Sequence, residues 1–413
     1  MSVSNSPVDG HDLLSIPRRE SFGRILGQCR AIPGVSKILR VGRKRFIERI
    51  KSPQRQVLIG QILRYGSGRD FQAALGSWAR SASVPVEPFF LPTGEITKRC
   101  SVIVNTVDRA TELEQTLASL KTEWNSADEL IVVLGPTGDR SEEIIGRSPV
   151  PCQLIRCPER NLAISRNLGL QAASGSFVAF IDDDASPTPG WLDALLQPFE
   201  EDPKVGISAG FVLDGEGRHF LNRYVVADTL GRAFWIDDAA PAREKIDRLG
   251  PQRAFLTATG CNMAFRRAAL ESIGGFDPFY RYFLEETDVV WRVISAGFKC
   301  AISPTSKVMH RLGSNLARTP SFDPESRSAV VRSQIHYIGK FGKSTFTALE
   351  IEACVWERVL LDLEKIAWDC CENTSRNPLC GDLQQRYLSA VAGELRLDSP
   401  PDSSSLSPPP RPS

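Results

Sequence analysis

Short apolar runs alternate with helix-like segments through the middle of the chain. The runs are rich in β-branched residues and span 101–107, 129–135, 152–157 and 176–182. Between them, segments such as ELEQTLASL and ISRNLGLQAA repeat their apolar positions every three or four residues, as amphipathic helices do. Because strands that alternate with helices usually pair in parallel, the pattern predicts an α/β fold with a mostly parallel central sheet.

The segments on either side of this region repeat their apolar residues at helical spacing. The first and last residues of the chain show no such repeat. The predicted order is a disordered N-terminus (1–16), a basic helical region (17–82), a linker (83–98), the α/β domain (99–320), a helical C-terminal extension (321–396) and a disordered Pro/Ser-rich tail (397–413). Within the α/β domain, residues 215–250 show no clear period, and we predict a loop-rich insertion there.

Composition is that of a globular protein, with 42% hydrophobic and 24% charged residues and a net charge of +1. No apolar run approaches the roughly 18 residues that cross a bilayer, and the N-terminus does not resemble a secretion signal. We therefore expect a cytoplasmic protein. Its ten cysteines do not follow zinc-site spacing, which indicates reduced thiols.

Charge is unevenly distributed along the chain. Residues 1–99 hold 17 Lys or Arg against 7 Asp or Glu, whereas the remainder holds 33 against 42. A basic segment can dock on an anionic membrane, at its inner face, or pack on the protein's own acidic body. We keep both hypotheses, and expect no nucleic-acid partner.

Three consecutive carboxylates, Asp182, Asp183 and Asp184, follow the buried-type strand 176–182. Adjacent like charges repel and require a counter-charge. Ligands bind beyond the carboxyl ends of parallel strands, and Mg²⁺ or Mn²⁺ is commonly held there by one or two carboxylates together with substrate phosphates. A solvated turn is the alternative, but the position after a strand favours a metal site.

A second acidic group, Glu285, Glu286 and Asp288, opens a helix with an apolar stripe. Carboxylates in a first helical turn are stabilised by the helix dipole, so capping alone explains them. His310 ends the next predicted strand. It is either a metal ligand or simply a polar residue at the end of a strand. In the segment 158–170, Arg160 and Arg166 suit phosphate or surface ion pairs equally.

Together these motifs resemble glycosyltransferase family 2, whose members have the GT-A fold and invert the anomeric centre. The resemblance covers about 100–312 and rests on four ordered motifs: SVIVNTVDRATELEQTLASL, RNLAISRNLGLQAASGSFVAFIDDDASPTPGWLDAL, GCNMAFRRAALESIGGFDPFYRYFLEETDVVWRVISAGFKC and SPTSKVMHRLG. They look like the opening strand and helix, the Asp-x-Asp metal motif, the acceptor signature with its acidic motif, and the strand that often ends in histidine.

The resemblance implies roles for individual residues. Asp184 would ligate the cation, Asp183 would lie by the ribose, and Asp182 would support the turn. Glu286 aligns with the catalytic base, and His310 lies where some members complete the metal shell. The residues at nucleotide-contacting positions are Thr106, Asp108, Arg109 and Arg166.

Two departures from the family pattern leave alternatives open. The base position usually holds aspartate, so Glu285 or Asp288 can replace Glu286 in that role. The second strand usually ends in an aspartate near the nucleobase, but this chain has Leu134 and Gly135 there. The nucleotide of the donor is therefore not predicted.

The leading hypothesis is a metal-dependent inverting glycosyltransferase. It would use Mn²⁺ or Mg²⁺ and a nucleotide-sugar donor, and its acceptor would be a hydroxyl of a glycan or lipid-linked glycan. In one displacement, a carboxylate takes the acceptor proton while the cation neutralises the leaving diphosphate. The alternatives are an inactive GT-A-like domain that binds a glycan or protein, and a metal-dependent nucleotidyltransferase.

Overall fold

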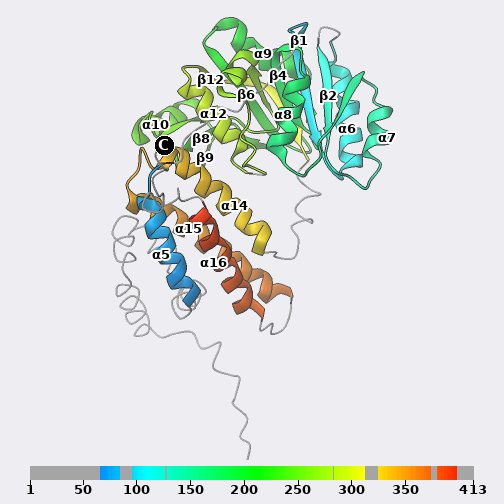
Figure 1. Ribbon diagram of the computed structural model, residues 1–413. Helices are drawn as coiled ribbons and strands as arrows, with labels where there is room; N and C mark the ends of the chain where they lie inside the picture. Colours follow the sequence, from blue (N-terminus) through cyan, green and yellow to red (C-terminus); the bar gives the residue numbers. More distant parts are fainter. Residues whose placement is uncertain are drawn as a thin grey trace, which may run out of the picture. The chain divides into compact units, whose positions relative to one another are not determined.

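The structure, a computed structural model, describes residues 66–83, 95–125, 128–281, 283–311, 324–373 and 379–397. The chain divides into two compact units (Figure 1). The larger is Ala82–Thr345, and the other combines the segments Met1–Ser81 and Phe346–Ser413. In the described part of the chain, no helix has both the length and the apolar composition that crossing a bilayer requires.

A nine-stranded sheet forms the centre of the larger unit. Its strand order is β3 (Cys152–Arg156), β2 (Glu129–Leu134), β1 (Lys98–Thr106), β4 (Gly175–Asp182), β11 (Met263–Arg266), β6 (Val205–Asp214), β12 (Lys299–His310) and β5 (Ala185–Pro187), with β7 (Phe220–Asn222) beside β6. Strands β3, β2, β1 and β4 are parallel, as are β6 and β12. Strands β11, β5 and β7 are antiparallel to their neighbours. The predicted α/β fold with a mostly parallel central sheet is confirmed.

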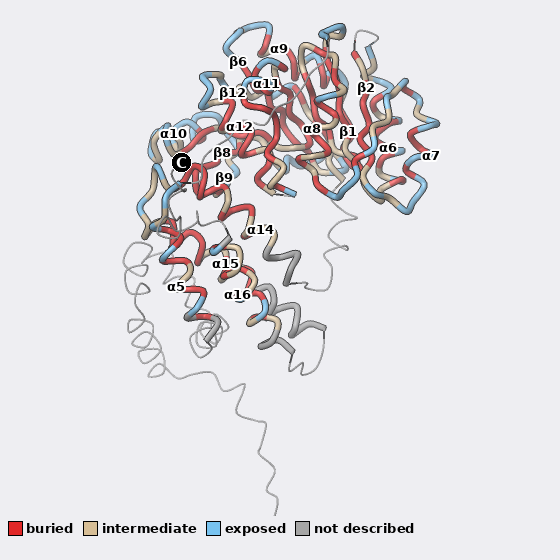
Figure 2. The backbone as a smooth tube through the Cα atoms, in the orientation of Figure 1, coloured by how far each residue is buried: buried red, intermediate tan, exposed pale blue. Residues whose placement is uncertain are grey.

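Helices cover both faces of this sheet because its central strands are apolar on both sides. In β1, Val102 and Val104 belong to one core and Ile103 to the other. The helices of the first core are α6 (Ala110–Leu120), α7 (Ser141–Gly146) and α9 (Trp191–Glu201), and those of the second are α8 (Leu162–Ala172), α11 (Arg267–Ile273) and α12 (Glu285–Ser295). The central strands are buried along most of their length (Figure 2). Two-sided burial explains why their sequences are continuously apolar.

The region 215–250 is structured, so the prediction of a loop-rich insertion is wrong. Its elements are β7, β8 (Tyr224–Asp228), β9 (Ala233–Ile236) and α10 (Ala239–Leu249). Strand β8 pairs with β9 and with β10 (Ala254–Thr257) in a small antiparallel sheet, on which α10 packs through Ala242. Strands of four or five residues are too short to show a period in the sequence.

After β12, the larger unit ends with α14 (Pro324–Tyr337) and a π-helical turn, Ile338–Gly342. The boundary between the units, after Thr345, falls inside the segment 321–396 that we predict as a C-terminal extension.

The smaller unit joins helices from both ends of the chain. It contains α5 (Gly66–Arg80), α15 (Ala348–Asn373) and α16 (Leu379–Leu397), and α5 contacts both of the others. Phe71 packs edge-on against Trp356, whose indole N–H donates to Gln72 at 2.6 Å. Outside the described residues lie the predicted N-terminus, the tail beyond Leu397, most of the linker, and the basic region before Gly66, on which the membrane hypothesis rests.

Candidate functional site

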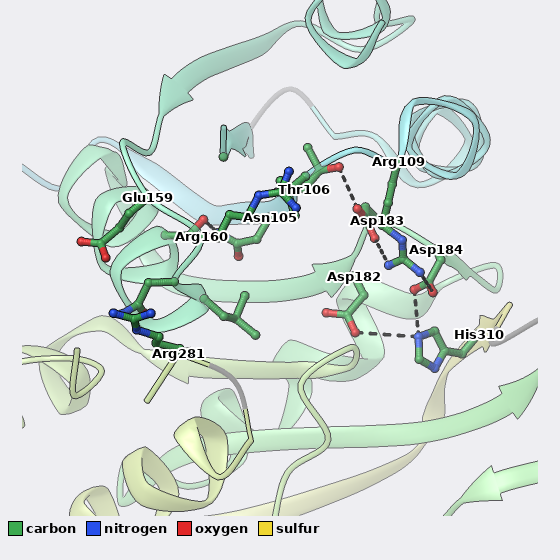
Figure 3. Close-up of a pocket in the computed structure, with 15 residues that line it drawn as sticks. Asn105, Thr106, Arg109, Glu159, Arg160, Asp182, Asp183, Asp184, Arg281 and His310 are labelled. Atoms are coloured by element: carbon green, nitrogen blue, oxygen red, sulfur yellow. Dashed lines mark hydrogen bonds and ion pairs between the residues drawn. The ribbon is translucent and has the colours of Figure 1, made fainter. Parts of the chain in front are cut away.

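A cavity of about 550 Å³ opens at the carboxyl ends of β1 and β4, where the sequence predicts the site (Figure 3). Strand β12 brings His310 to the same place, since its last residues pair with Asp214 and Ala185. The cavity is lined by Asn105, Thr106, Val107, Arg109, Gly135, Glu159, Arg160, Asn161, Leu162, Ser165, Asp182, Asp183, Asp184, Arg281 and His310. Six of the predicted nucleotide and metal residues line this cavity, and the other two, Asp108 and Arg166, do not.

Two of the three aspartates are held by protein cations (Figure 3). Asp183 accepts hydrogen bonds from Thr106 Oγ1 at 2.7 Å and from Arg109 at 2.6 Å. Asp184 accepts from Arg109 at 2.7 Å and pairs with His310 Nε2 at 2.8 Å. Arg109 thus bridges both carboxylates and supplies part of the counter-charge that the sequence predicts.

The two bridged carboxylates differ in their electrostatics. Burial raises the pKa of Asp183 to about 7 even though Arg109 and Thr106 oppose the change. Burial also acts to raise the pKa of Asp184, but the hydrogen bond from His310 and the charges of His310 and Arg109 outweigh it, and that pKa is lowered. Asp184 is therefore the more strongly ionised of the two.

Asp182 is the most exposed of the three carboxylates. Its side chain is 39% exposed, against 4% for Asp183 and 2% for Asp184. One carboxylate oxygen lies 3.8 Å from His310 Nε2. The ligand atoms of Asp182, His310 and Cys261 all lie within 4.8 Å of one another, which is a spacing that a metal ion can bridge. All three aspartates line the cavity, and Asp182 is the least buried of them.

Asp108 lies beside the cavity and organises its rim. Its backbone has φ +52°, and its carboxylate accepts from the Gly138 N–H at 3.0 Å, from Thr137 Oγ1 at 2.9 Å and from Arg160. The hydrogen bond from Gly138 and then that from Arg160 lower the pKa of Asp108. Asp108 thus fixes the loop after β2 and directs Arg160, which lines the cavity.

The acidic turn of α12 is tied to the site through Arg166. The Arg166 guanidinium donates to Glu285 at 2.9 Å, and both side chains are buried. The same guanidinium lies 5.6 Å from the Phe180 ring centroid and 5.4 Å from that of Phe276. A Cβ added at Gly260 would lie 2.7 Å from this guanidinium, which explains glycine at that position. Arg166 therefore holds Glu285 instead of lining the cavity.

Glu286 and Asp288 have different surroundings. Burial, and next the charge of Glu285, raises the pKa of Glu286. Glu286 makes no ion pair with a described residue. Asp288 is fully buried, and it pairs with Arg292 at 2.6 Å and with Lys340. None of the described cavity-lining residues belongs to α12, so the wall of this cavity does not include these carboxylates.

Several site residues are absent from the sequence-based prediction. Asn105 precedes Thr106 in β1 and donates to Ser165 Oγ at 2.6 Å. Asn161 caps α8 by accepting from the Ile164 N–H at 3.1 Å. Asn161 could have been predicted as the N-cap residue before a helix. Asn105 could have been predicted as a polar residue near the end of an apolar strand. Cys261 and Arg281 give no local signal, because distant loops bring them to the site.

Comparison with known proteins associates this region with a family. Residues 101–274 match the model of the family described as "Glycosyl transferase family 2". The matched segment includes most of β1, all of β4 and the three aspartates but ends before α12. The α/β sheet of the larger unit agrees with the GT-A fold that the family resemblance implies.

Individual relatives are more distant. The chain is 25% identical over 225 residues to a "Pre-mycofactocin glycosyltransferase" of Mycobacterium tuberculosis, covering 53% of this chain and 44% of the relative. It is 27% identical over 154 residues to an "N-acetylglucosaminyl-diphospho-decaprenol L-rhamnosyltransferase" of the same organism, covering 35% and 50%. The chain thus spans about half the length of these curated relatives, or less. A solved structure, mannosyltransferase PcManGT from Pyrobaculum calidifontis in complex with GDP-Man and Mn²⁺, matches with 17% identity and a TM-score of 0.45, over 84% of this chain and 97% of that one.

Proposed function

We propose, from the match of residues 101–274 to the model of glycosyltransferase family 2, that the protein transfers a sugar from a nucleotide-diphosphate sugar to an acceptor hydroxyl. The observation that carries the proposal is the partly exposed carboxylate of Asp182, which belongs to the matched segment and faces the cavity beside His310. A diphosphate bound there would be adjacent to two guanidinium groups, those of Arg160 and Arg281.

The donor atoms at this place fit a divalent cation. Asp182 and His310 offer a carboxylate oxygen and an imidazole nitrogen, and Asp184 is in contact with His310. A site that includes histidine suits a transition-metal ion such as Mn²⁺ better than Mg²⁺, whose ligands are usually oxygens. When bound, the cation would neutralise charge that develops on the departing diphosphate. We therefore assign Asp182 and His310 to the metal, with Asp184 orienting His310 and Asp183 supporting the turn, and favour Mn²⁺.

The general base is assigned by exclusion among the three carboxylates of α12. Glu285 is held by Arg166, and Asp288 is held by Arg292 and Lys340. Glu286 has a raised pKa, which is suited to accepting a proton from a hydroxyl. In a single inverting displacement, Glu286 would take the acceptor proton while the hydroxyl oxygen attacks the anomeric carbon and the nucleoside diphosphate leaves.

The acceptor is proposed only as a class. The second relative above is named for a lipid-linked acceptor, a decaprenyl diphosphate sugar. A glycan or lipid-linked glycan hydroxyl would supply the nucleophile in this mechanism.

A donor screen tests the function. Purified protein is mixed with UDP-, GDP- and dTDP-sugars, with and without Mn²⁺, and both the melting temperature and released nucleoside diphosphate are measured. Bound ligand at about 100 times its Kd should stabilise the fold by about 2.7 kcal/mol. We expect at least one donor to stabilise the protein and be hydrolysed only with Mn²⁺. Stabilisation by glycans without any turnover would favour the inactive binding domain instead.

A further inference from the structure

The acidic turn of α12 is preceded by a strained backbone. Phe283 and Leu284 have φ values of +75° and +70°, a left-handed conformation that is rare for residues with bulky side chains. Leu284 is the N-cap of α12, and its carbonyl accepts from the Asp288 N–H at 2.8 Å. Such a conformation persists only where surrounding contacts impose it. Glu285 and Glu286 directly follow this turn, so their placement depends on those contacts.

Apolar contacts from the end of α14 hold the strained turn. Leu284 is 5% exposed and belongs to a cluster with Tyr280, Tyr337 and Phe341. Tyr337 ends α14, and Phe341 lies in the π-helical turn Ile338–Gly342. All five residues of that turn are buried. π-Helical turns are rare and occur frequently at functional sites.

The charge of Lys340, in the same π-helical turn, joins two carboxylates from separate elements. Its Nζ donates to Asp277 at 2.9 Å and to Asp288, and its side chain is 3% exposed. Asp277 also pairs with His336 of α14 at 2.9 Å and accepts from the Phe279 N–H at 2.9 Å. The ammonium therefore ties Asp277 to Asp288, which lie on either side of the strained turn and both glutamates in the chain.

We infer that Lys340 is a positioning residue, which fixes the first turn of α12 and thereby the Glu286 carboxylate. The inference rests on the proposed function only for its effect on turnover. Lys340 lies outside the segment 101–274 that matches the family model. Asp288, a sequence-based candidate for the base, is in this arrangement the anchor through which Lys340 acts.

The test compares Lys340→Met with Arg99→Met. Each change removes one cation that pairs with a buried carboxylate. Lys340 pairs with Asp288, and Arg99 pairs with Asp128. Arg99 lies at the amino end of β1, at the opposite end of that strand from the cavity. Hydrogen exchange of a peptide covering 283–292 should become at least about 10-fold faster in Lys340→Met and remain unchanged in Arg99→Met.

Turnover provides the second readout. With Mn²⁺ and a donor that the wild type hydrolyses, such as UDP-glucose or GDP-mannose, Lys340→Met should lower kcat by roughly 10- to 100-fold, because small misplacements of a reacting group are costly. The donor KM should stay within about 3-fold, because the cavity wall is intact, and Lys340→Arg should recover part of kcat. If Lys340→Met does not fold, Asp277→Asn takes its place.

The two proposals fail in different ways. Unchanged exchange over 283–292, or a loss confined to KM, would overturn the positioning role of Lys340. If the wild type hydrolyses no donor, the proposed function fails, and the exchange measurement alone then decides whether Lys340 holds the turn.

Discussion

Two clusters of carboxylates, Asp182–Asp184 at the end of β4 and Glu285–Asp288 at the start of α12, share one arrangement of ion pairs: two members are held by cations at hydrogen-bond distance, and among the described residues the third is not. In the first, Arg109 and His310 hold Asp183 and Asp184, which leaves Asp182 as the exposed member. In the second, Arg166 holds Glu285 and Lys340 holds Asp288, which leaves Glu286 without an ion pair to any described residue. In both clusters, cations from distant parts of the chain determine which carboxylate is available for chemistry.

The clusters differ in what surrounds the available member. Asp182 faces an open cavity beside an imidazole, which suits a metal ion and a diphosphate. Glu286 is half-buried next to a second carboxyl group, which raises its pKa and suits proton transfer. In the proposed mechanism, the same arrangement of ion pairs would leave a metal-binding carboxylate in one cluster and a proton acceptor in the other.

The largest expected effect is that of Glu286→Gln. The glutamine amide cannot take the proton from the acceptor hydroxyl, so the rate of sugar transfer should fall about 10²- to 10⁴-fold. Donor affinity should be unchanged, because Glu286 does not line the cavity. The measurement combines product formation with isothermal titration of the donor. Glu201→Gln, on an exposed position of α9, is the control and should retain full activity. Equal activity of the two variants would place the base elsewhere.

The next effect separates the members of the aspartate cluster. Asp182→Asn should weaken Mn²⁺-dependent donor binding by about 10- to 100-fold, as expected when a metal site loses support. Asp183→Asn should instead lower the free energy of unfolding, by about 1–3 kcal/mol, because Arg109 and Thr106 lose a buried partner. Donor titration and urea unfolding of both variants distinguish these outcomes. If Asp183→Asn has the larger effect on Mn²⁺-dependent binding, the family-implied roles hold and the geometric reassignment fails.

The sequence predicts the sheet and the site's location because both follow from short-range patterns. Apolar runs define the strands, and the parallel register of β1 and β4 pairs Asn105 with Asp182 and places Thr106 beside Asp183. The roles inside each cluster depend on pairs such as Arg166 with Glu285, which are 119 residues apart. No local pattern encodes such a pair. Lys340 gives no signal for the same reason, and Cys261 meets His310 only in the folded sheet.

The smallest expected effect concerns stability against pH, and it tests the held members of the second cluster. Burial acts to raise the pKa of Asp277, but the hydrogen bond from His336 and the charges of Lys340 and His336 outweigh it, and the pKa is lowered. A carboxyl group with a lowered pKa in the folded state stabilises the fold above its unfolded pKa, about 3.9 for aspartate. That stabilisation is lost progressively as the pH falls from this value towards the lower pKa of the folded state.

The wild type should therefore melt roughly 5–15 °C above Asp277→Asn at pH 7, since a buried ion pair is broken, and this gap should narrow towards pH 3. Differential scanning fluorimetry across this range measures the gap directly. Asp202→Asn is the matched control, because Asp202 also has a lowered pKa but pairs with Lys299 at the surface, at 2.7 Å. Surface pairs contribute little, so this variant should melt close to the wild type at every pH. If the difference in melting temperature between the wild type and Asp277→Asn is the same at every pH, the charge of Asp277 does not hold the segment before Glu286.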